Sequence, residues 1–282
     1  MALSEVLNSS GDDVVPLVRR AATAEEIRWS VVDQYIDRER LEGCDAVVHL
    51  AGASIADGRW TPKRKAVIRD SRVDGTRLLC EALAQLSHKP QVLVTGSAVG
   101  FYGDAKDREV DEASPVGEGF LADVCQAWER AAQPARDAGI RVVYLRTGLV
   151  MDPSGGALSK MVPVFRMGAG GPLGDGRQYM PWITLRDQVR VIQHCIRSDL
   201  EGPVNATAPQ PVEQRVFARA LGRALRRPAF APAPRFVIRA LLGQMGTEAL
   251  LTGQRAVPRA LLDSGFAFLD PELEPALTSM LA

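Results

Sequence analysis

A serine and a tyrosine stand close together in residues 95–104, TGSAVGFYGD. The segment continues an apolar, strand-like run, which places Ser97 and Tyr102 near the carboxyl end of a predicted strand. A hydroxyl and a phenol there can bind a substrate hydroxyl or carbonyl, and the phenol can exchange a proton if a nearby cation lowers its pKa. We predict both as catalytic residues; the alternative is a packed tyrosine and a turn serine.

Small residues end the preceding apolar run, VVHLAG at 47–52. Ligands of open α/β sheets bind beside the carboxyl ends of strands, where small residues let a cofactor approach the backbone. We therefore predict that Ala51 and Gly52 contact a cofactor, together with Thr95 and Gly96 at the next strand end. The alternative is a strand that ends in a small turn.

Arginines follow two other runs. Arg19 and Arg20 come after residues 13–18, where arginine accommodates the additional phosphate of NADP, so NADP is favoured over NAD. Arg146 ends the run RVVYLR and is a further candidate for an anionic ligand, although it could equally be structural.

The second half offers candidate substrate contacts. Tyr179 and Trp182 lie in the glycine-rich stretch 168–183, a predicted loop that could close over the ligand. Asn205, in VNATAP, lies near the end of a late strand and could orient the backbone or a substrate. Packing in the core is the alternative for Trp182. Asp187 is predicted to cap the next helix rather than to act in catalysis.

The elements that must position these residues alternate. Continuously apolar runs indicate strands covered on both faces, as in a parallel sheet, and they occur at 13–18, 45–52, 91–100 and 141–151. Helical patterns separate them at 62–87 and 120–138 and dominate from about residue 211. The pattern predicts an α/β fold with a Rossmann-like, doubly wound parallel sheet and a smaller, mainly helical C-terminal part.

Composition excludes several classes of function. The 34 basic and 34 acidic side chains cancel, so we expect neither nucleic acid nor a membrane surface as a partner. We expect a cytoplasmic protein, because no apolar run is long enough to cross a bilayer and no signal sequence is recognisable. The scattered cysteines and histidines predict reduced thiols and no metal site.

These motifs together resemble an atypical branch of the extended short-chain dehydrogenase/reductases, the NAD(P)-binding, epimerase-like proteins. The resemblance rests on residues 45–79, VTGSAVGFYGD, AWE, LRTGLVM, GGALSKMVPVFRMGAGGPLGDGRQYMPWI and GPVNATAP. Residues 250–277 resemble the small C-terminal domain of unknown function of this branch. The resemblance implies a dinucleotide-binding domain at 1–150, with a late strand returning from about 180–208, and a substrate-side and C-terminal domain at 151–282. It also implies a small-molecule substrate and a monomer or homodimer.

Members of this branch begin with a strand and a glycine-rich turn that receives the pyrophosphate. Residues 1–20 match the branch only from inside the first helix onward, so that strand and turn are expected to be missing. The missing strand would leave two inner sheet edges unpaired, and cofactor binding would lose the amides of the turn. We favour an incomplete N-terminus over a protein that dispenses with the turn.

The usual tyrosine and lysine of the family are also replaced. Aligning Glu129 with the acidic position of the helix puts Leu121 and Cys125 where the pair would be, and neither can supply a phenol or an ammonium. The first hypothesis is an NADP-dependent oxidoreductase or epimerase-like protein acting on a small carbonyl, hydroxyl or sugar-like substrate. The alternatives are a non-catalytic, nucleotide-responsive regulatory or binding protein, related to cell division in some relatives, and an inactive truncated form.

Overall fold

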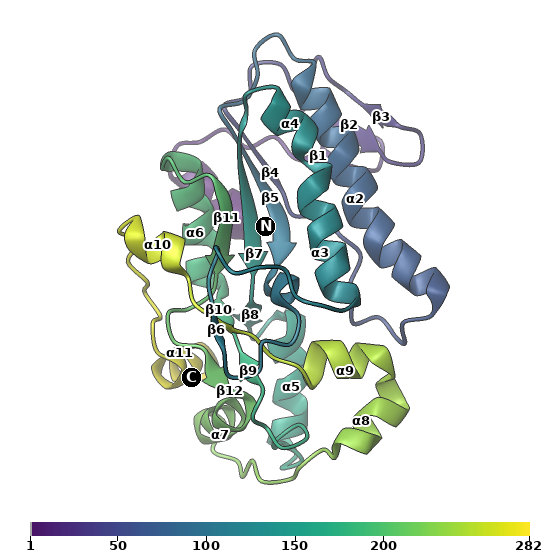
Figure 1. Cartoon of the computed structure of the whole chain (residues 1–282). Helices are drawn as coiled ribbons and strands as arrows, with labels where there is room; N and C mark the ends of the chain where they lie inside the picture. Colours follow the sequence, from purple (N-terminus) through teal and green to yellow (C-terminus); the bar gives the residue numbers. More distant parts are fainter. Residues whose placement is uncertain (1) are drawn as a thin grey trace.

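The computed structural model of the protein describes residues 2–282 and has a parallel sheet at its centre (Figure 1). The strands of this four-stranded sheet follow the order β11-β7-β5-β4. Their bounds are Ala46–His49 for β4, Val92–Ala98 for β5, Arg141–Thr147 for β7 and Gly202–Ala206 for β11. All neighbouring pairs are parallel. The predicted Rossmann-like α/β fold is therefore confirmed.

A second, smaller sheet holds the N-terminal strands. It consists of β1 (Leu17–Val18), β2 (Ile27–Ser30) and β3 (Tyr35–Ile36), with β1 and β2 parallel. Within residues 2–282, no strand joins β1 to β4 by hydrogen bonds, so the sheet is divided where the sequence predicts a missing strand. Side chains bridge the division instead: Trp29 of β2 packs edge-on against His49 of β4, with 5.5 Å between the ring centroids.

Helices cover both faces of the central sheet. One face packs against α2 (Pro62–Ala84), α3 (Phe120–Ala131) and α4 (Gln133–Asp137), and the other against α6 (Leu185–Arg197), beside which lies α1 (Ala2–Ser9). The prediction of one helix over 120–138 is wrong. The helix breaks between α3 and α4, where Pro134 lacks the amide hydrogen that a continuous helix would use.

The apolar run at 141–151 also divides. Gly148 separates β7 from β8 (Leu149–Asp152), and β8 pairs with β10 (Trp182–Thr184) in another sheet. A side chain at Gly148 would place its first carbon 2.5 Å from the carbonyl oxygen of Pro181. The close approach of two backbones thus requires glycine at the point where the chain leaves the central sheet.

The second half of the chain is mainly helical. Its helices are α5 (Gly156–Arg166), α7 (Gln214–Ala224), α8 (Arg235–Leu242), α9 (Gln244–Leu250), α10 (Arg259–Asp263) and α11 (Leu273–Leu281). Short elements complete the fold: η1 (Val99–Tyr102), β6 (Glu109–Val110), β9 (Tyr179–Met180), β12 (Val212–Glu213) and β13 (Arg255–Ala256). Among residues 2–282, no helix combines the length and the apolar character needed to cross a bilayer.

Candidate functional site

The two predicted strand ends meet at one edge of the sheet. β4 and β5 are parallel neighbours, and His49 is in register with Thr95, so Gly52, which follows β4, and Ser97, near the end of β5, lie on the same side of the molecule. We call the residues that follow β4 and those at the end of β5, Leu50–Ala53 and Ser97–Tyr102, the strand-end edge. Ala51 and Gly52 are both exposed there.

Ser97 and Arg146 converge on an acidic residue of α3. The Ser97 hydroxyl donates to Oε1 of Glu129 at 2.7 Å, and Arg146 donates to both carboxylate oxygens, at 2.8 and 3.0 Å. Burial alone would lower the pKa of Arg146, but Glu129 and Tyr102 raise it above its usual value. The charge of Arg146 is therefore engaged inside the protein, which supports its structural interpretation over an anion-binding one.

Tyr102 is enclosed by the same network. It is 1% exposed, its phenol donates to Oδ1 of Asn205 at 2.7 Å, and it accepts from Nη1 of Arg146 at 3.0 Å. Burial raises the pKa of Tyr102 to about 12 despite the nearby Arg146. A phenol with both hydrogen bonds made and a high pKa is a poor proton donor to a ligand. The structure gives no support to the predicted catalytic role of Tyr102, and matches the packed tyrosine of the alternative.

Asn205 is fully buried and links separate parts of the chain. Its side-chain nitrogen donates to the carbonyl of Val257 at 2.9 Å, and its backbone nitrogen donates to Oε1 of Glu112 at 2.9 Å. These contacts leave no exposed amide for the predicted substrate contact. Sequence reasoning missed Glu112, whose pKa is raised by burial, because nothing in its surface-like segment signals that β11 covers it.

The residues at the positions of the family's tyrosine and lysine face the strand-end edge. A side-chain carbon built on Gly100 would lie 3.3 Å from Cβ of Leu121 and 3.9 Å from Sγ of Cys125. Burial raises the pKa of the Cys125 thiol to about 12, so it stays protonated at neutral pH. Neither side chain can transfer a proton to a ligand, as the sequence analysis predicts for this pair.

An apolar cluster surrounds the start of α3. Trp60, Ile68, Val124 and Met245 form its buried part, and Leu121 packs against it. The backbone nitrogen of Leu121 donates to Oε2 of Glu248 in α9 at 3.0 Å, which supplies the helix with the cap that Gly119 lacks. The C-terminal region thus closes over the end of α3 nearest the strand-end edge.

Thr95 and Gly96 lie within the sheet rather than at its exposed edge. Thr95 is fully buried, and within residues 2–282 its hydroxyl has no hydrogen-bond partner. A side-chain carbon on Gly96 would come within 2.6 Å of the Trp128 indole, which donates to the Thr76 hydroxyl at 2.8 Å. Gly96 is thus needed for the packing of Trp128, and the structure gives no support to a cofactor contact by either residue.

An arginine that sequence reasoning missed lies beside Gly52. Cζ of Arg72 would be 3.0 Å from a side-chain carbon on Gly52, and Nη1 donates to the carbonyls of Ala53 and Ile68, both at 2.9 Å. Arg72 belongs to α2, where its spacing is that of an ordinary helical residue. Only the fold shows that its side chain reaches the strand-end edge.

The predicted arginine pair follows β1, but its members differ. Nη1 of Arg20 donates to Oε2 of Glu26 at 2.8 Å, and the second guanidinium nitrogen binds the other oxygen. The hydrogen bond from Arg20 is the largest of the interactions that lower the pKa of Glu26 to about 2. Arg19 is exposed and has no ion-pair partner within residues 2–282. Arg19 is therefore the more available of the two for a phosphate.

Trp182 and Tyr179 lie on short strands. Trp182 is 0% exposed, packs in the same apolar cluster as Phe217, and donates from its indole to the carbonyl of Gln210 at 3.1 Å. The predicted substrate contact of Trp182 is therefore not supported, and its packing alternative is. Tyr179 is half-buried, with the Arg255 guanidinium 5.5 Å from its ring centroid, and its substrate contact stays a prediction.

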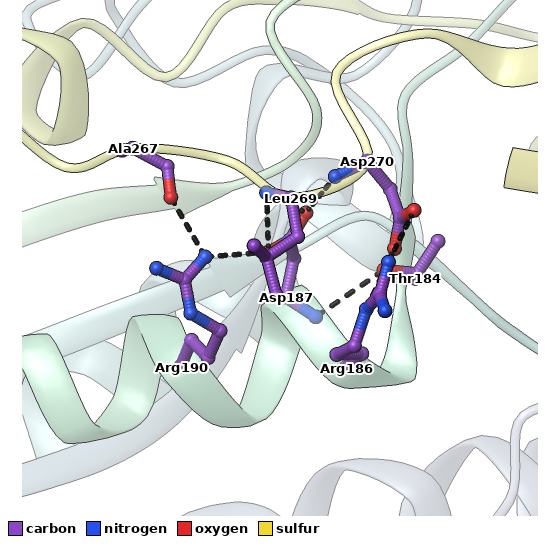
Figure 2. Close-up of polar contacts among 7 residues, drawn as sticks. All are labelled: Thr184, Arg186, Asp187, Arg190, Ala267, Leu269 and Asp270. Atoms are coloured by element: carbon purple, nitrogen blue, oxygen red, sulfur yellow. Dashed lines mark hydrogen bonds and ion pairs between the residues drawn. The ribbon is translucent and has the colours of Figure 1, made fainter. Parts of the chain in front are cut away.

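Asp187 anchors a C-terminal segment (Figure 2). The cap of α6 is Thr184, whose hydroxyl accepts from the Asp187 backbone at 3.2 Å, so the prediction that Asp187 itself is the cap is wrong. The Asp187 carboxylate instead accepts from the backbone nitrogens of Leu269 and Asp270, the latter at 2.8 Å, and from Arg190 at 3.0 Å. The structural role predicted for Asp187 therefore holds.

A cavity of ≈ 240 Å³ lies beside this anchor. None of the residues of the strand-end edge lines it.

Comparisons with known proteins agree with this fold. Residues 1–207 match the model of the NAD dependent epimerase/dehydratase family, and residues 233–280 match a domain of unknown function, DUF1731. The epimerase family protein Mb2239 of Mycobacterium bovis is 45% identical over 95% of this chain and 89% of its own length. The epimerase family protein SDR39U1 of mouse is 36% identical over 100% of this chain and 95% of its own.

Solved structures give the same result. Human SDR39U1 (isoform 2), crystallised with NADPH, is similar with a TM-score of 0.91 and 33% identity, covering 99% of this chain and 94% of that one. A nucleoside-diphosphate sugar epimerase from Corynebacterium glutamicum has a TM-score of 0.81 and 31% identity, covering 99% of this chain and 55% of that one. The chain therefore belongs to the NAD dependent epimerase/dehydratase family, and within it to the SDR39U1-like proteins.

Proposed function

We propose that this protein binds NADP(H) at the strand-end edge and acts on a small carbonyl, hydroxyl or sugar-like substrate. The observation that carries the proposal is the juxtaposition of Gly52 and Arg72, which puts a cation beside a strand end that has no side chain of its own. A dinucleotide needs such a cation, because its phosphates are anionic. The NADPH bound by the similar human protein supports the same cofactor class.

The choice of NADP over NAD rests on the end of β1. Arg19 is exposed immediately after Val18, whereas the charge of Arg20 is engaged with Glu26. We propose that Arg19 contacts the additional phosphate of NADP. Replacing both arginines by alanine should erase the preference for NADPH over NADH and leave NADH affinity nearly unchanged. An unchanged ratio of the two dissociation constants would contradict the assignment.

The reaction needs a proton donor besides the cofactor. When bound, the nicotinamide supplies hydride chemistry. Ser97, at the end of β5, is the hydroxyl we propose to orient a substrate oxygen, and Glu129 holds that hydroxyl at 2.7 Å. A rotation of the hydroxyl from Glu129 toward the substrate would supply the hydrogen bond.

A second candidate function is that of a non-catalytic, nucleotide-responsive binding protein. It is favoured by the apolar packing of Leu121, the buried thiol of Cys125 and the enclosed phenol of Tyr102. These three side chains leave the strand-end edge without the phenol and ammonium that the family's reaction uses. Nucleotide binding does not depend on them.

Calorimetric titration of the protein with NADPH and NADH tests the cofactor. We expect saturable binding of NADPH and a thermal stabilisation that grows with its concentration. The proposal would be overturned if millimolar NADPH produced no heat of binding and no thermal stabilisation. Loss of NADPH absorbance at 340 nm upon addition of aldehydes, ketones or keto sugars then separates the two functions. Tight NADPH binding would favour the second function if none of these compounds is turned over and NMR detects no epimerisation of sugar nucleotides.

A further inference from the structure

We propose that Arg72 is the anion-binding residue of the strand-end edge, and that its guanidinium takes an oxyanion, phosphate or carboxylate, of the molecule bound there. This inference deepens the proposed function and rests on it for the location of the ligand. It concerns a residue of α2, whereas the site residues predicted from sequence lie at strand ends.

The hydrogen bonds of Arg72 orient its guanidinium and leave one side open. Both come from Nη1, which donates to the carbonyls of Ala53 and Ile68 at 2.9 Å. Within residues 2–282, Nε and Nη2 make no hydrogen bond, and neither is sealed from solvent. These two nitrogens share one edge of the planar group, which is the edge that binds a carboxylate or phosphate through two parallel hydrogen bonds.

The charge of Arg72 has no counter-ion among the described residues. Both of its hydrogen-bond acceptors are neutral carbonyl oxygens, and no carboxylate of residues 2–282 lies within ion-pairing distance. Arg64, a second arginine of α2, donates to the carbonyl of Ser54 and pairs with Asp57 at 3.3 Å. Burial is the main cause that lowers the pKa of Arg72, and the nearby charge of Arg64 lowers it further. A half-buried cation in this situation is stabilised by a bound anion.

The side chain of Arg72 lies between the strand-end edge and helix α3. Its guanidinium touches Gly52 after β4 and lies 5.1 Å from the centre of the Trp128 indole in α3. Trp128 follows Cys125 by three residues, so both side chains lie on one face of α3. Arg72 therefore presents a cation beside the positions at which Leu121 and Cys125 provide none.

The test compares three variants by calorimetric titration with NADPH. Arg72→Gln removes the charge, Arg72→Lys keeps the charge without the two-pronged donor edge, and Arg69→Gln is the control. Arg69 is an exposed arginine of the same helix that pairs with Asp70 at 2.8 Å. We expect Arg72→Gln to weaken the binding of its oxyanion by about 10- to 100-fold, the range of a charged hydrogen bond, and Arg72→Lys by less. Arg69→Gln should bind like the wild type.

Two further probes identify the source of the oxyanion. If it is a cofactor phosphate, Arg72→Gln loses affinity for NADPH and for inorganic pyrophosphate together. If it belongs to the substrate, NADPH affinity is unchanged, and the thermal stabilisation of the NADPH complex by phosphate or malonate is lost. Unchanged responses to NADPH, pyrophosphate, phosphate and malonate in Arg72→Gln would overturn the inference.

The outcomes also separate this inference from the proposed function. A wild type that does not bind NADPH defeats the proposed function, and the pyrophosphate and phosphate titrations still decide the role of Arg72. A wild type that responds to no anion defeats the inference. If Arg72→Gln does not fold, Arg72→Lys decides: equal affinity of lysine and arginine for every probe would rule out the two-pronged contact.

Discussion

Glu129 of α3 and Arg146 of β7 form a two-pronged ion pair beneath the strand-end edge. Nε of Arg146 lies 2.8 Å from one carboxylate oxygen and Nη2 lies 3.0 Å from the other. The two side chains are 12% and 5% exposed, and Ser97 adds a third hydrogen bond to the same carboxylate. Three separate elements are thereby fixed to one another by a single acidic residue.

The replacement Glu129→Gln should be strongly destabilising. It leaves the buried guanidinium of Arg146 without its counter-ion, and removing one partner of a buried pair costs about 3–5 kcal/mol of the free energy of unfolding. Urea denaturation followed by circular dichroism measures this loss. Glu118→Gln, at an exposed position of the neighbouring loop, is the matched control and should unfold like the wild type. A loss below about 1 kcal/mol would mean that solvent screens the pair.

The convergence of Ser97, Arg146 and Asn205 was predictable in part. Each is the next-to-last residue of a strand, and parallel strands bring their carboxyl ends to one edge even when the residues are far apart in sequence. Their burial was not predictable, because it depends on Glu112 and Val257, which come from segments with no periodic pattern. Sequence could place these residues together, but it could not show that their side chains bond to Glu129 and Tyr102 rather than to a ligand.

The fold was predictable for the same reason that some boundaries were not. Continuous apolar runs indicate buried parallel strands, but the run at 141–151 contains two strands of different sheets joined at Gly148. Its composition is uniform, and only the close approach of Pro181 distinguishes the turn. Arg72 was missed likewise, because its spacing is that of an exposed helical residue and its proposed role depends on the neighbouring strand end.

Replacing Tyr102 by phenylalanine tests whether its phenol is structural. The change leaves Oδ1 of Asn205 without its donor, so we expect a loss of about 1–2 kcal/mol in the free energy of unfolding. Tyr35→Phe, at a residue that is 44% exposed, is the control and should have little effect. Because the pKa of Tyr102 is about 12, its ionisation should be absent from absorbance titrations near neutral pH. A Tyr102 phenolate at pH 7–8 would restore the catalytic interpretation.

Gly96→Ala should destabilise the protein through Trp128. The new methyl group would start 2.6 Å from the indole, which must move and strain its hydrogen bond to Thr76. Overpacking of this kind costs about 1–3 kcal/mol. Thermal unfolding of Gly96→Ala, Trp128→Leu and the double variant forms a complete cycle. We expect the alanine to cost less in the Trp128→Leu background; additive losses would show that the indole is not the obstacle.

Asp187→Asn should loosen the segment that holds Leu269 and Asp270. An amide in place of the carboxylate turns a donor toward two backbone nitrogens and removes the partner of Arg190, at a cost of about 2 kcal/mol in the free energy of unfolding. Hydrogen exchange should accelerate at the amides of both anchored residues. Asp263→Asn, an exposed change in the preceding helix, should leave that exchange unchanged. Unaltered protection in Asp187→Asn would show that other contacts hold the segment.

Protonation of His49 should make the protein acid-sensitive. Burial lowers the pKa of His49 to about 4, its side chain packs against Trp29, and the residue is only 5% exposed. The unfolded chain, with a histidine pKa of about 6.5, binds a proton that the folded protein excludes between these two values. The contribution of neutral His49 to the free energy of unfolding is therefore complete above pH 6.5. It is lost as the pH falls toward 4, by about 3 kcal/mol in total. Urea unfolding at pH 7.0, 5.5 and 4.5 should show a steeper loss for the wild type than for His49→Gln, with exposed His88→Gln as the control. Parallel losses in the wild type and His49→Gln would assign the acid sensitivity to other groups.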